Sequence, residues 1–203
     1  MTRQQITLLS IFALFLAPVL LVALMSTSWW AYQPEGFSNR GQLVQPPVAL
    51  PLGQRQQDGS GVSATAFAGK WLLLYVMPEN CQRRCTDDIV SLRQVYKATG
   101  RQGQHLAIVL LNRKQVDNEL KSKIASISEE MHLLAMAPAE TLSTLLQISS
   151  DLAGEKQQAG TIRTYVVDPL LNVVLAYGED ASPGDINKDL KRLLKWSVQD
   201  KTP

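Results

Sequence analysis

The sequence predicts an α/β domain, with a mixed sheet flanked by helices, that follows one N-terminal transmembrane helix. The domain is predicted by short apolar runs rich in strand formers that alternate with amphipathic helical segments. Two late apolar runs separated by a turn indicate a β-hairpin, which makes the sheet mixed. The membrane helix is predicted by an uncharged run of apolar or small residues at 6–25. A chain of 203 residues has room for one ordinary domain and such an appendage.

The N-terminal run has the length to cross a bilayer, because about 20 helical residues span about 30 Å. Arg3 precedes it, and aromatic residues typical of a membrane interface follow it, namely Trp29, Trp30 and Tyr32. We therefore expect an uncleaved single-pass signal anchor in the inner membrane of a bacterial cell. Residues 1–5 would then lie in the cytoplasm and the C-terminal domain in the periplasm.

A cleaved signal peptide is the alternative, with the small residues at 26–28 as its cleavage site. The apolar cores of signal peptides usually have about 7–15 residues, so the length of the run favours the anchor.

Residues 26–58 indicate a linker rich in proline and glutamine, with little apolar periodicity. Proline favours extended chain, so this segment can hold the domain away from the membrane. Short apolar pieces at 43–44 and 48–50 could add a strand or pack on the edge of the domain. We place the start of the domain near Gly59, which gives a folded unit over residues 59–203.

The domain begins with a buried strand at residues 71–76, WLLLYV, which ends before Pro78. A loop with two cysteines follows, and then a helix that we expect to be capped near Thr86 and to end at Gly100. The later elements are expected in this order: a strand at 105–111, a helix at 117–127, a strand at 131–136, a short helix at 138–148, strands at 164–167 and 173–177, and a closing helix from Pro183. The order β-α-β-α followed by β-β-α is a thioredoxin-like arrangement.

Cys81 and Cys85 are the only cysteines in the chain, and they lie between the first strand and the helix after it. A helix N-terminus favours the thiolate form, which is both the nucleophile and the metal ligand. Arg83 and Arg84 lie between the cysteines and also favour thiolate, whereas the neighbouring acids oppose it: Glu79, Asp87 and Asp88. Residues at i and i+4 are about 6 Å apart along a helical turn, near the upper end of disulfide spacing. The pair is a candidate for disulfide exchange or for binding Cu(I), a soft ion that suits sulfur.

Each of these signals has a structural alternative. The cysteines could form a purely structural disulfide, but closing so short a loop gains little stability, so redox or metal use is favoured. Met77 could add a thioether ligand, although a core methionine is the stronger interpretation. His105 and His132 have no partner at ligand spacing and are interpreted as ordinary histidines. Met131 and Met136 fall on opposite faces of a strand and cannot form one copper site.

With this motif and this order of elements, the sequence resembles the Sco/SenC family. The resemblance rests on the Cys81-Gln-Arg-Arg-Cys85 loop after a strand and on the late Tyr165-Val-Val-Asp-Pro169 segment, and it covers roughly residues 45–197. Members of that family are tethered copper chaperones and thiol oxidoreductases that help to build the dinuclear copper site of cytochrome c oxidase. The resemblance implies that the two cysteines are the reactive pair. It also implies a partner among the cytochrome oxidase subunits or the other copper-assembly proteins.

The sequence departs from the family pattern at its prolines and at its histidine. The family motif is Cys-Pro-x-x-Cys-Pro, and here Gln82 and Thr86 stand in place of the prolines. The copper-ligating histidine of the family falls at Gly160, and neither histidine of this chain lies near that position. The third copper ligand is therefore missing. This absence favours a redox role over copper delivery and leaves Cys81 and Cys85 as the candidate Cu(I) ligands.

Two classes of function remain open. In the first, the protein is a thiol-disulfide oxidoreductase: one cysteine attacks a partner disulfide, such as a copper-site cysteine pair, and the other resolves the mixed disulfide. In the second, it is a non-enzymatic assembly or docking factor, of which a Cu(I)-carrying chaperone is a variant. We favour the first. A net charge of +2 gives no basis for nucleic acid as a partner.

Overall fold

The computed structural model describes residues 3–25, 39–52, 67, 69–128, 131–134, 137–155 and 162–199. The chain divides into two compact units, Met1–Ser38 and Asn39–Pro203. The first unit contains helix α1 (Arg3–Met25), in which Arg3–Leu24 has a mean hydropathy of 2.7. Among the described residues, α1 is the one helix long and apolar enough to cross a membrane, a length and composition that a signal sequence also has. The expected aromatic belt and cleavage site lie outside the described residues.

The second unit is built on a six-stranded sheet with the strand order β1-β6-β5-β2-β3-β4. β2, β3 and β4 run parallel, whereas β5 is antiparallel to β2, β6 to β5, and β1 to β6. The strands are β1 (Gln42–Ala49), β2 (Trp71–Val76), β3 (Leu106–Leu111), β4 (Met131–Leu134), β5 (Ile162–Val167) and β6 (Asn172–Gly178). The mixed sheet that the sequence predicts is therefore confirmed, with the late hairpin β5–β6 next to β2.

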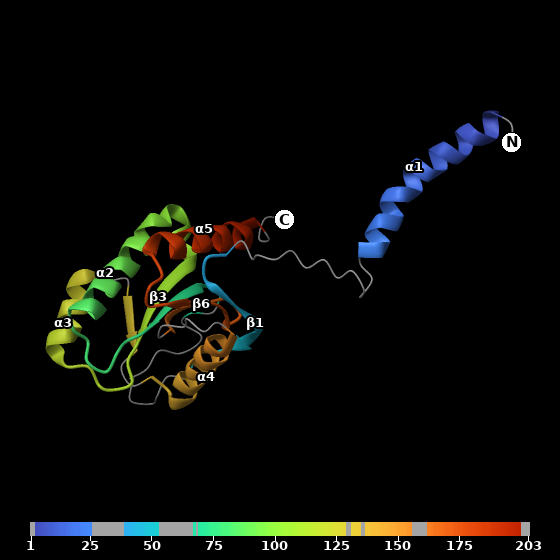
Figure 1. The fold of residues 1–203 in the computed structure, drawn as a ribbon. Coiled ribbons are helices and arrows are strands. Elements are labelled where there is room, and N and C mark those ends of the chain that lie inside the picture. Colours follow the sequence, from blue (N-terminus) through green and yellow to red (C-terminus); the bar gives the residue numbers. More distant parts are fainter. Residues whose placement is uncertain are drawn as a thin grey trace. The chain divides into compact units, whose positions relative to one another are not determined.

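Helices cover both faces of the sheet (Figure 1). They are α2 (Arg83–Ala98), the 3₁₀ helix η2 (Gly100–His105), α3 (Asn118–Ile127), α4 (Ala139–Glu155) and α5 (Pro183–Gln199). Successive residues of β2 point to opposite faces, so that Leu73 and Tyr75 pack in the apolar cluster beneath α2, α3 and α5. Leu72 and Leu74 pack on the other face, in the cluster beneath α4. Burial on both faces explains why β2 has a continuous apolar sequence.

Helix α2 begins earlier than the sequence predicts. Its N-cap is Gln82, whose side chain makes no capping hydrogen bond, so the expected cap at Thr86 is wrong. The backbone N–H of Thr86 donates to the Gln82 carbonyl at 3.1 Å, and its hydroxyl donates to the same oxygen at 3.3 Å. Thr86 thus lies within the first helical turn. The helix ends at Ala98, and Gly100 follows with a φ of 59°, a conformation that favours glycine.

Three further segments differ most from the expected boundaries, and the others agree to within two residues. The compact unit begins at Asn39, ahead of the expected start near Gly59, because β1 joins the sheet as an edge strand. Helix α4 continues to Glu155, past the expected end at residue 148, because buried Leu152 extends its apolar face. Of the strand expected at 131–136, residues 131–134 form β4, and the last two lie outside the described residues.

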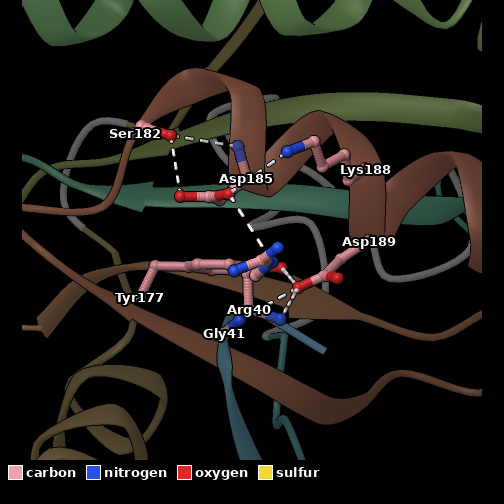
Figure 2. Close-up of polar contacts among 7 residues, drawn as sticks. All are labelled: Arg40, Gly41, Tyr177, Ser182, Asp185, Lys188 and Asp189. Carbon is pink, nitrogen blue, oxygen red and sulfur yellow. Dashed lines mark hydrogen bonds and ion pairs between the residues drawn. The ribbon is translucent and has the colours of Figure 1, made fainter. Parts of the chain in front are cut away.

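A buried carboxylate fixes the start of β1 to α5 (Figure 2). Asp189 is 3% exposed, and its Oδ2 atom accepts hydrogen bonds from the backbone N–H groups of Arg40 at 2.8 Å and Gly41 at 2.9 Å. The hydroxyl of Tyr177, on β6, donates to the same oxygen at 3.0 Å. These contacts join the chain entering the domain to both its sheet and its last helix.

Candidate functional site: a dithiol pair at the end of the central strand

Strand β2 leads directly to the cysteine pair. It lies between β3 and β5 in the interior of the sheet, and the backbone N–H of Met77, just after it, donates to the Leu111 carbonyl at 2.8 Å. The chain then turns into α2. Cys81 lies just ahead of this helix and Cys85 lies in its first turn, and the two form a disulfide with their Cα atoms 5.2 Å apart. The structure therefore brings together the two residues that the sequence predicts as a reactive pair.

The two cysteines differ in burial. Cys85 is 3% exposed and belongs to the apolar cluster that contains Met77 and Ile89. Cys81 is half-buried and packs against the edge of that cluster. Of the two sulfur-bearing side chains, Cys81 is therefore the more accessible to another protein.

A carboxylate that pairs with Arg84, the residue before Cys85, also binds a second arginine. Glu179 follows β6, and its Oε1 atom accepts a hydrogen bond from Nε of Arg163, on β5, at 2.6 Å. Its Oε2 atom lies 3.3 Å from an Nη atom of Arg84, which lies between the two cysteines. Arg163 and Glu179 are 26% and 23% exposed, so this pair is shielded from much of the solvent. The charged group around Arg84 therefore consists of three side chains from three different parts of the fold.

A second polar contact lies beside this arrangement. The hydroxyl of Tyr75, at the end of β2, donates to Oδ2 of Asp88 at 2.8 Å. Burial raises the pKa of Tyr75 above its ordinary value, and the hydrogen bond to Asp88 raises it further. The phenol therefore stays protonated and keeps the Asp88 carboxylate in place, one helical turn after Cys85.

These polar groups line a cleft of about 100 Å³ between α2 and the start of α5. Its lining includes Tyr75, Asp88, Ser91, Arg163, Glu179 and Pro183. A water molecule in the liquid takes up about 30 Å³, so the cleft has room for a few waters or one small side chain.

An exposed ion pair lies ahead of the cysteines. Nζ of Lys114 is 3.1 Å from Oε2 of Glu79, with the two side chains 67% and 56% exposed. The hydrogen bond from Lys114 and its charge hold the pKa of Glu79 below its ordinary value. This pair is open to solvent, so salt screens it far more than it screens the pair of Arg163 and Glu179.

Three other sequence candidates, Met77, His105 and His132, lie within the described residues. Met77 is 2% exposed within the apolar core, as the core interpretation predicts. The ring of His132 packs edge-on against Phe67 with centroids 5.2 Å apart, and His105 has a ring nitrogen 3.0 Å from the amide nitrogen of Gln104. Gly160 and Met136 lie outside the described residues. Among the described residues, no group of three histidine, cysteine or acidic side chains could hold a metal ion.

The donor set therefore does not fit a three-ligand copper site. In the disulfide form the two sulfurs are bonded to each other and offer no thiolate. Cu(I) binds thiolates, so only the reduced pair could hold it. Reduction would give two thiolates, and among the described residues no histidine, further cysteine or acidic side chain completes a group of three with them.

Sequence reasoning found the cysteines but missed Glu179, Arg163 and Tyr75. No motif or spacing connects these residues with the cysteine loop, and β5 and β6 follow that loop only after α2, η2, β3, α3, β4 and α4. The one available signal was local: Arg84 is a charged residue between two cysteines.

A family model described as "transmembrane-like, thioredoxin-like, C-terminal domain" matches residues 71–197, which is more than half of the chain. No curated protein matches the sequence.

Several solved structures share the fold. Yeast Sco1 with copper bound has 17% sequence identity and a TM-score of 0.52, over 79% of this chain and 95% of that one. A SCO1/SenC family lipoprotein from Bacillus anthracis has 21% identity and a TM-score of 0.51, over 74% of this chain and 98% of that one. BsSco, described as a Sco-family cytochrome c oxidase assembly protein with a disulfide switch, has 18% identity and a TM-score of 0.50, over 81% and 98%.

These matches confirm the thioredoxin-like fold and the resemblance to Sco proteins that the cysteine loop and the order of elements predict. The chain belongs to the family of transmembrane-like, thioredoxin-like C-terminal domains, and its fold is the Sco-like variant of the thioredoxin fold.

Proposed function

We propose that this protein is a membrane-anchored thiol-disulfide oxidoreductase that acts on cysteine pairs of exported proteins, with the copper site of cytochrome c oxidase as its setting. The observation that carries the proposal is the unequal burial of Cys81 and Cys85 at the start of α2. A purely structural disulfide has no need of one accessible sulfur and one buried sulfur.

The reaction follows from this asymmetry. In the reduced protein, the Cys81 thiolate attacks a partner disulfide, whose sulfur–sulfur bond breaks and releases one partner thiolate. The Cys85 thiolate then attacks the Cys81 sulfur of the mixed disulfide and releases the second partner thiolate. The partner gains two electrons, and the protein returns to the disulfide form. A thiol donor in the same compartment must then reduce it for the next cycle.

The setting rests on the fold and on α1. BsSco shares the fold and is described as an oxidase assembly protein, and α1 is long and apolar enough to hold the domain at a membrane. We place the domain in the bacterial periplasm, where disulfides persist. Copper is then a cargo that enters the partner after its cysteines are reduced.

The decisive experiment is mixed-disulfide trapping with two single variants in cells. Cys85→Ser leaves the accessible thiol without its resolving partner, so it should accumulate a mixed disulfide that appears on a non-reducing gel and disappears with reductant. Cys81→Ser is the matched control and should trap far less, because the remaining thiol is buried. If neither variant traps a partner while both support oxidase assembly, the protein is a docking factor and the proposal is wrong.

A Cu(I) competition titration of the reduced protein tests the copper-chaperone alternative. With two thiolate ligands, we expect copper binding that a chelator of moderate affinity removes. Tight stoichiometric binding, lost in both serine variants, would favour the chaperone instead.

A further inference from the structure

We infer that Glu179 is a positioning residue for the dithiol: by binding Arg84 and Arg163 together, it keeps the reduction potential of the Cys81–Cys85 pair below the value that the two arginines would otherwise give. This inference rests on the proposed function, in which the pair is a redox couple.

The fold places the three charged groups at one end of the sheet. In the β5–β6 hairpin, Ile162 lies opposite Gly178. The residues that follow them, Arg163 and Glu179, therefore lie at the same end of the hairpin and form an ion pair. That end of β5 lies beside the C-terminal end of β2, because Thr164 pairs with Tyr75. The cysteine loop follows the same end of β2, and Arg84 extends from it to Glu179, 3.3 Å away.

The contacts make Glu179 the shared partner. Its two carboxylate oxygens bind different arginines. Oε1 lies 2.6 Å from Nε of Arg163, and Oε2 lies 3.3 Å from an Nη atom of Arg84. One carboxylate and two guanidinium groups carry a net charge of +1. The other acid on the lining of the cleft is Asp88, which accepts a hydrogen bond from the Tyr75 hydroxyl.

The sign of the effect follows from charge alone. Positive charge near a thiol stabilises the thiolate, and a stabilised reduced form makes the disulfide a stronger oxidant. Neutralising Glu179 leaves two guanidinium charges, so the disulfide should be reduced more easily. Neutralising Arg163 leaves a net charge of zero, because Glu179 still pairs with Arg84, so the disulfide should be reduced less easily.

Opposite shifts from two residues in one ion pair distinguish this role from a structural one. A mutation that merely loosened the cysteine loop would move the equilibrium in one direction whichever partner was removed. The partial burial of Arg163 and Glu179, 26% and 23% exposed, keeps that ion pair from being fully screened by salt, whereas Arg84 is 65% exposed and its contact with Glu179 is screened more.

The test is the redox equilibrium of the full-length, detergent-solubilised protein with glutathione, measured for wild type, Glu179→Gln, Arg163→Gln and the double variant. We expect Glu179→Gln to shift the equilibrium about threefold towards the reduced protein, which corresponds to about 14 mV for a two-electron couple. Arg163→Gln should shift it in the opposite direction, and the double variant should return close to wild type. Glu179→Asp should stay close to wild type because the charge remains.

Glu79→Gln is the matched control, since it removes a carboxylate near Cys81 from an exposed ion pair and should shift the equilibrium less. The alkylation rate of Cys81 against pH gives a second measurement, in which Glu179→Gln should lower the midpoint. Shifts of the same sign in Glu179→Gln and Arg163→Gln, or no shift in either, would overturn the inference while wild type still titrates. A wild-type protein without a reversible two-electron couple would overturn the proposed function itself.

Discussion

The hydroxyl of Tyr177 donates to the buried carboxylate of Asp189 at 3.0 Å, and this contact joins the last strand of the sheet to the last helix (Figure 2). Burial raises the pKa of Tyr177 above its ordinary value, and the charge of Asp189 raises it further. The phenol therefore remains a donor across the physiological range. The same carboxylate oxygen accepts hydrogen bonds from the backbone N–H groups of Arg40 and Gly41, so it also holds the residues just ahead of β1.

Asp189→Ala should lower the free energy of unfolding by about 2–4 kcal/mol, because it leaves two backbone N–H groups and one phenol without their acceptor. A urea titration followed by tryptophan fluorescence measures this loss.

Asp185→Ala is the control for a change in the charge of α5. Asp185 exchanges hydrogen bonds with Ser182 at the exposed start of the helix, at 2.8 and 3.1 Å. Asp185→Ala removes the carboxylate that accepts from Ser182 but keeps the backbone N–H that donates to it, so the loss should be about 1 kcal/mol at most. Equal losses in the two variants would contradict the special role of Asp189.

Gly41→Ala should destabilise the domain by about 1–3 kcal/mol through overpacking. A Cβ atom at this position would lie 2.6 Å from two ring carbons of Tyr177, which Asp189 holds in place. Gly184→Ala is the matched control, because its nearest neighbour would be Oγ of Ser182 at an ordinary 3.7 Å. A thermal melt of both variants tests the prediction, and a wild-type melting temperature for Gly41→Ala would contradict it.

Reduction of the Cys81–Cys85 disulfide should lower the free energy of unfolding by only about 2 kcal/mol, because the bridge closes a loop of about five residues. Urea titrations of the oxidised and reduced protein measure the difference, with the Cys81→Ser/Cys85→Ser double variant as a control that reductant does not change. A protein that unfolds on reduction would instead support the structural interpretation of the disulfide.

The buried strand β2 and the cysteine pair could be predicted because each has a strong local signal. Residues 71–76 are apolar without a break, and the chain has only two cysteines. Strand β1 could not be predicted with the same strength, because Pro46 and Pro47 lie within it and proline usually argues against a strand. The position of β1 at the edge of the sheet resolves this conflict, since an edge strand tolerates residues that cannot donate on its open side.

The charged part of the candidate site shows the limit of local signals. Arg84 meets Glu179 only because the β5–β6 hairpin packs against β2, a long-range arrangement that no spacing in the sequence encodes. Likewise, Thr86 and the two acids after it have the composition of a helix cap, yet the N-cap is Gln82, four residues earlier. Local propensity is a weak guide where tertiary packing and a disulfide fix the first turn.

Tyr165 predicts how the stability of the domain depends on alkaline pH. Its side chain is 2% exposed, its hydroxyl donates to the Leu145 carbonyl at 3.1 Å, and burial raises its pKa to about 12 from an ordinary 10.0. The unfolded chain therefore loses this proton at a lower pH than the folded chain does. The stability that the neutral phenol provides is complete below pH 10 and is lost as the pH rises towards 12. We expect the free energy of unfolding to fall by about 1 kcal/mol between about pH 10 and 11 from this residue.

Urea titrations at these pH values should show a smaller fall for Tyr165→Phe than for wild type, although buried Tyr75 and Tyr177 contribute with the same sign in both proteins. Identical falls in the two proteins would contradict the assignment, because they would mean that Tyr165 ionises equally in the folded and unfolded chains.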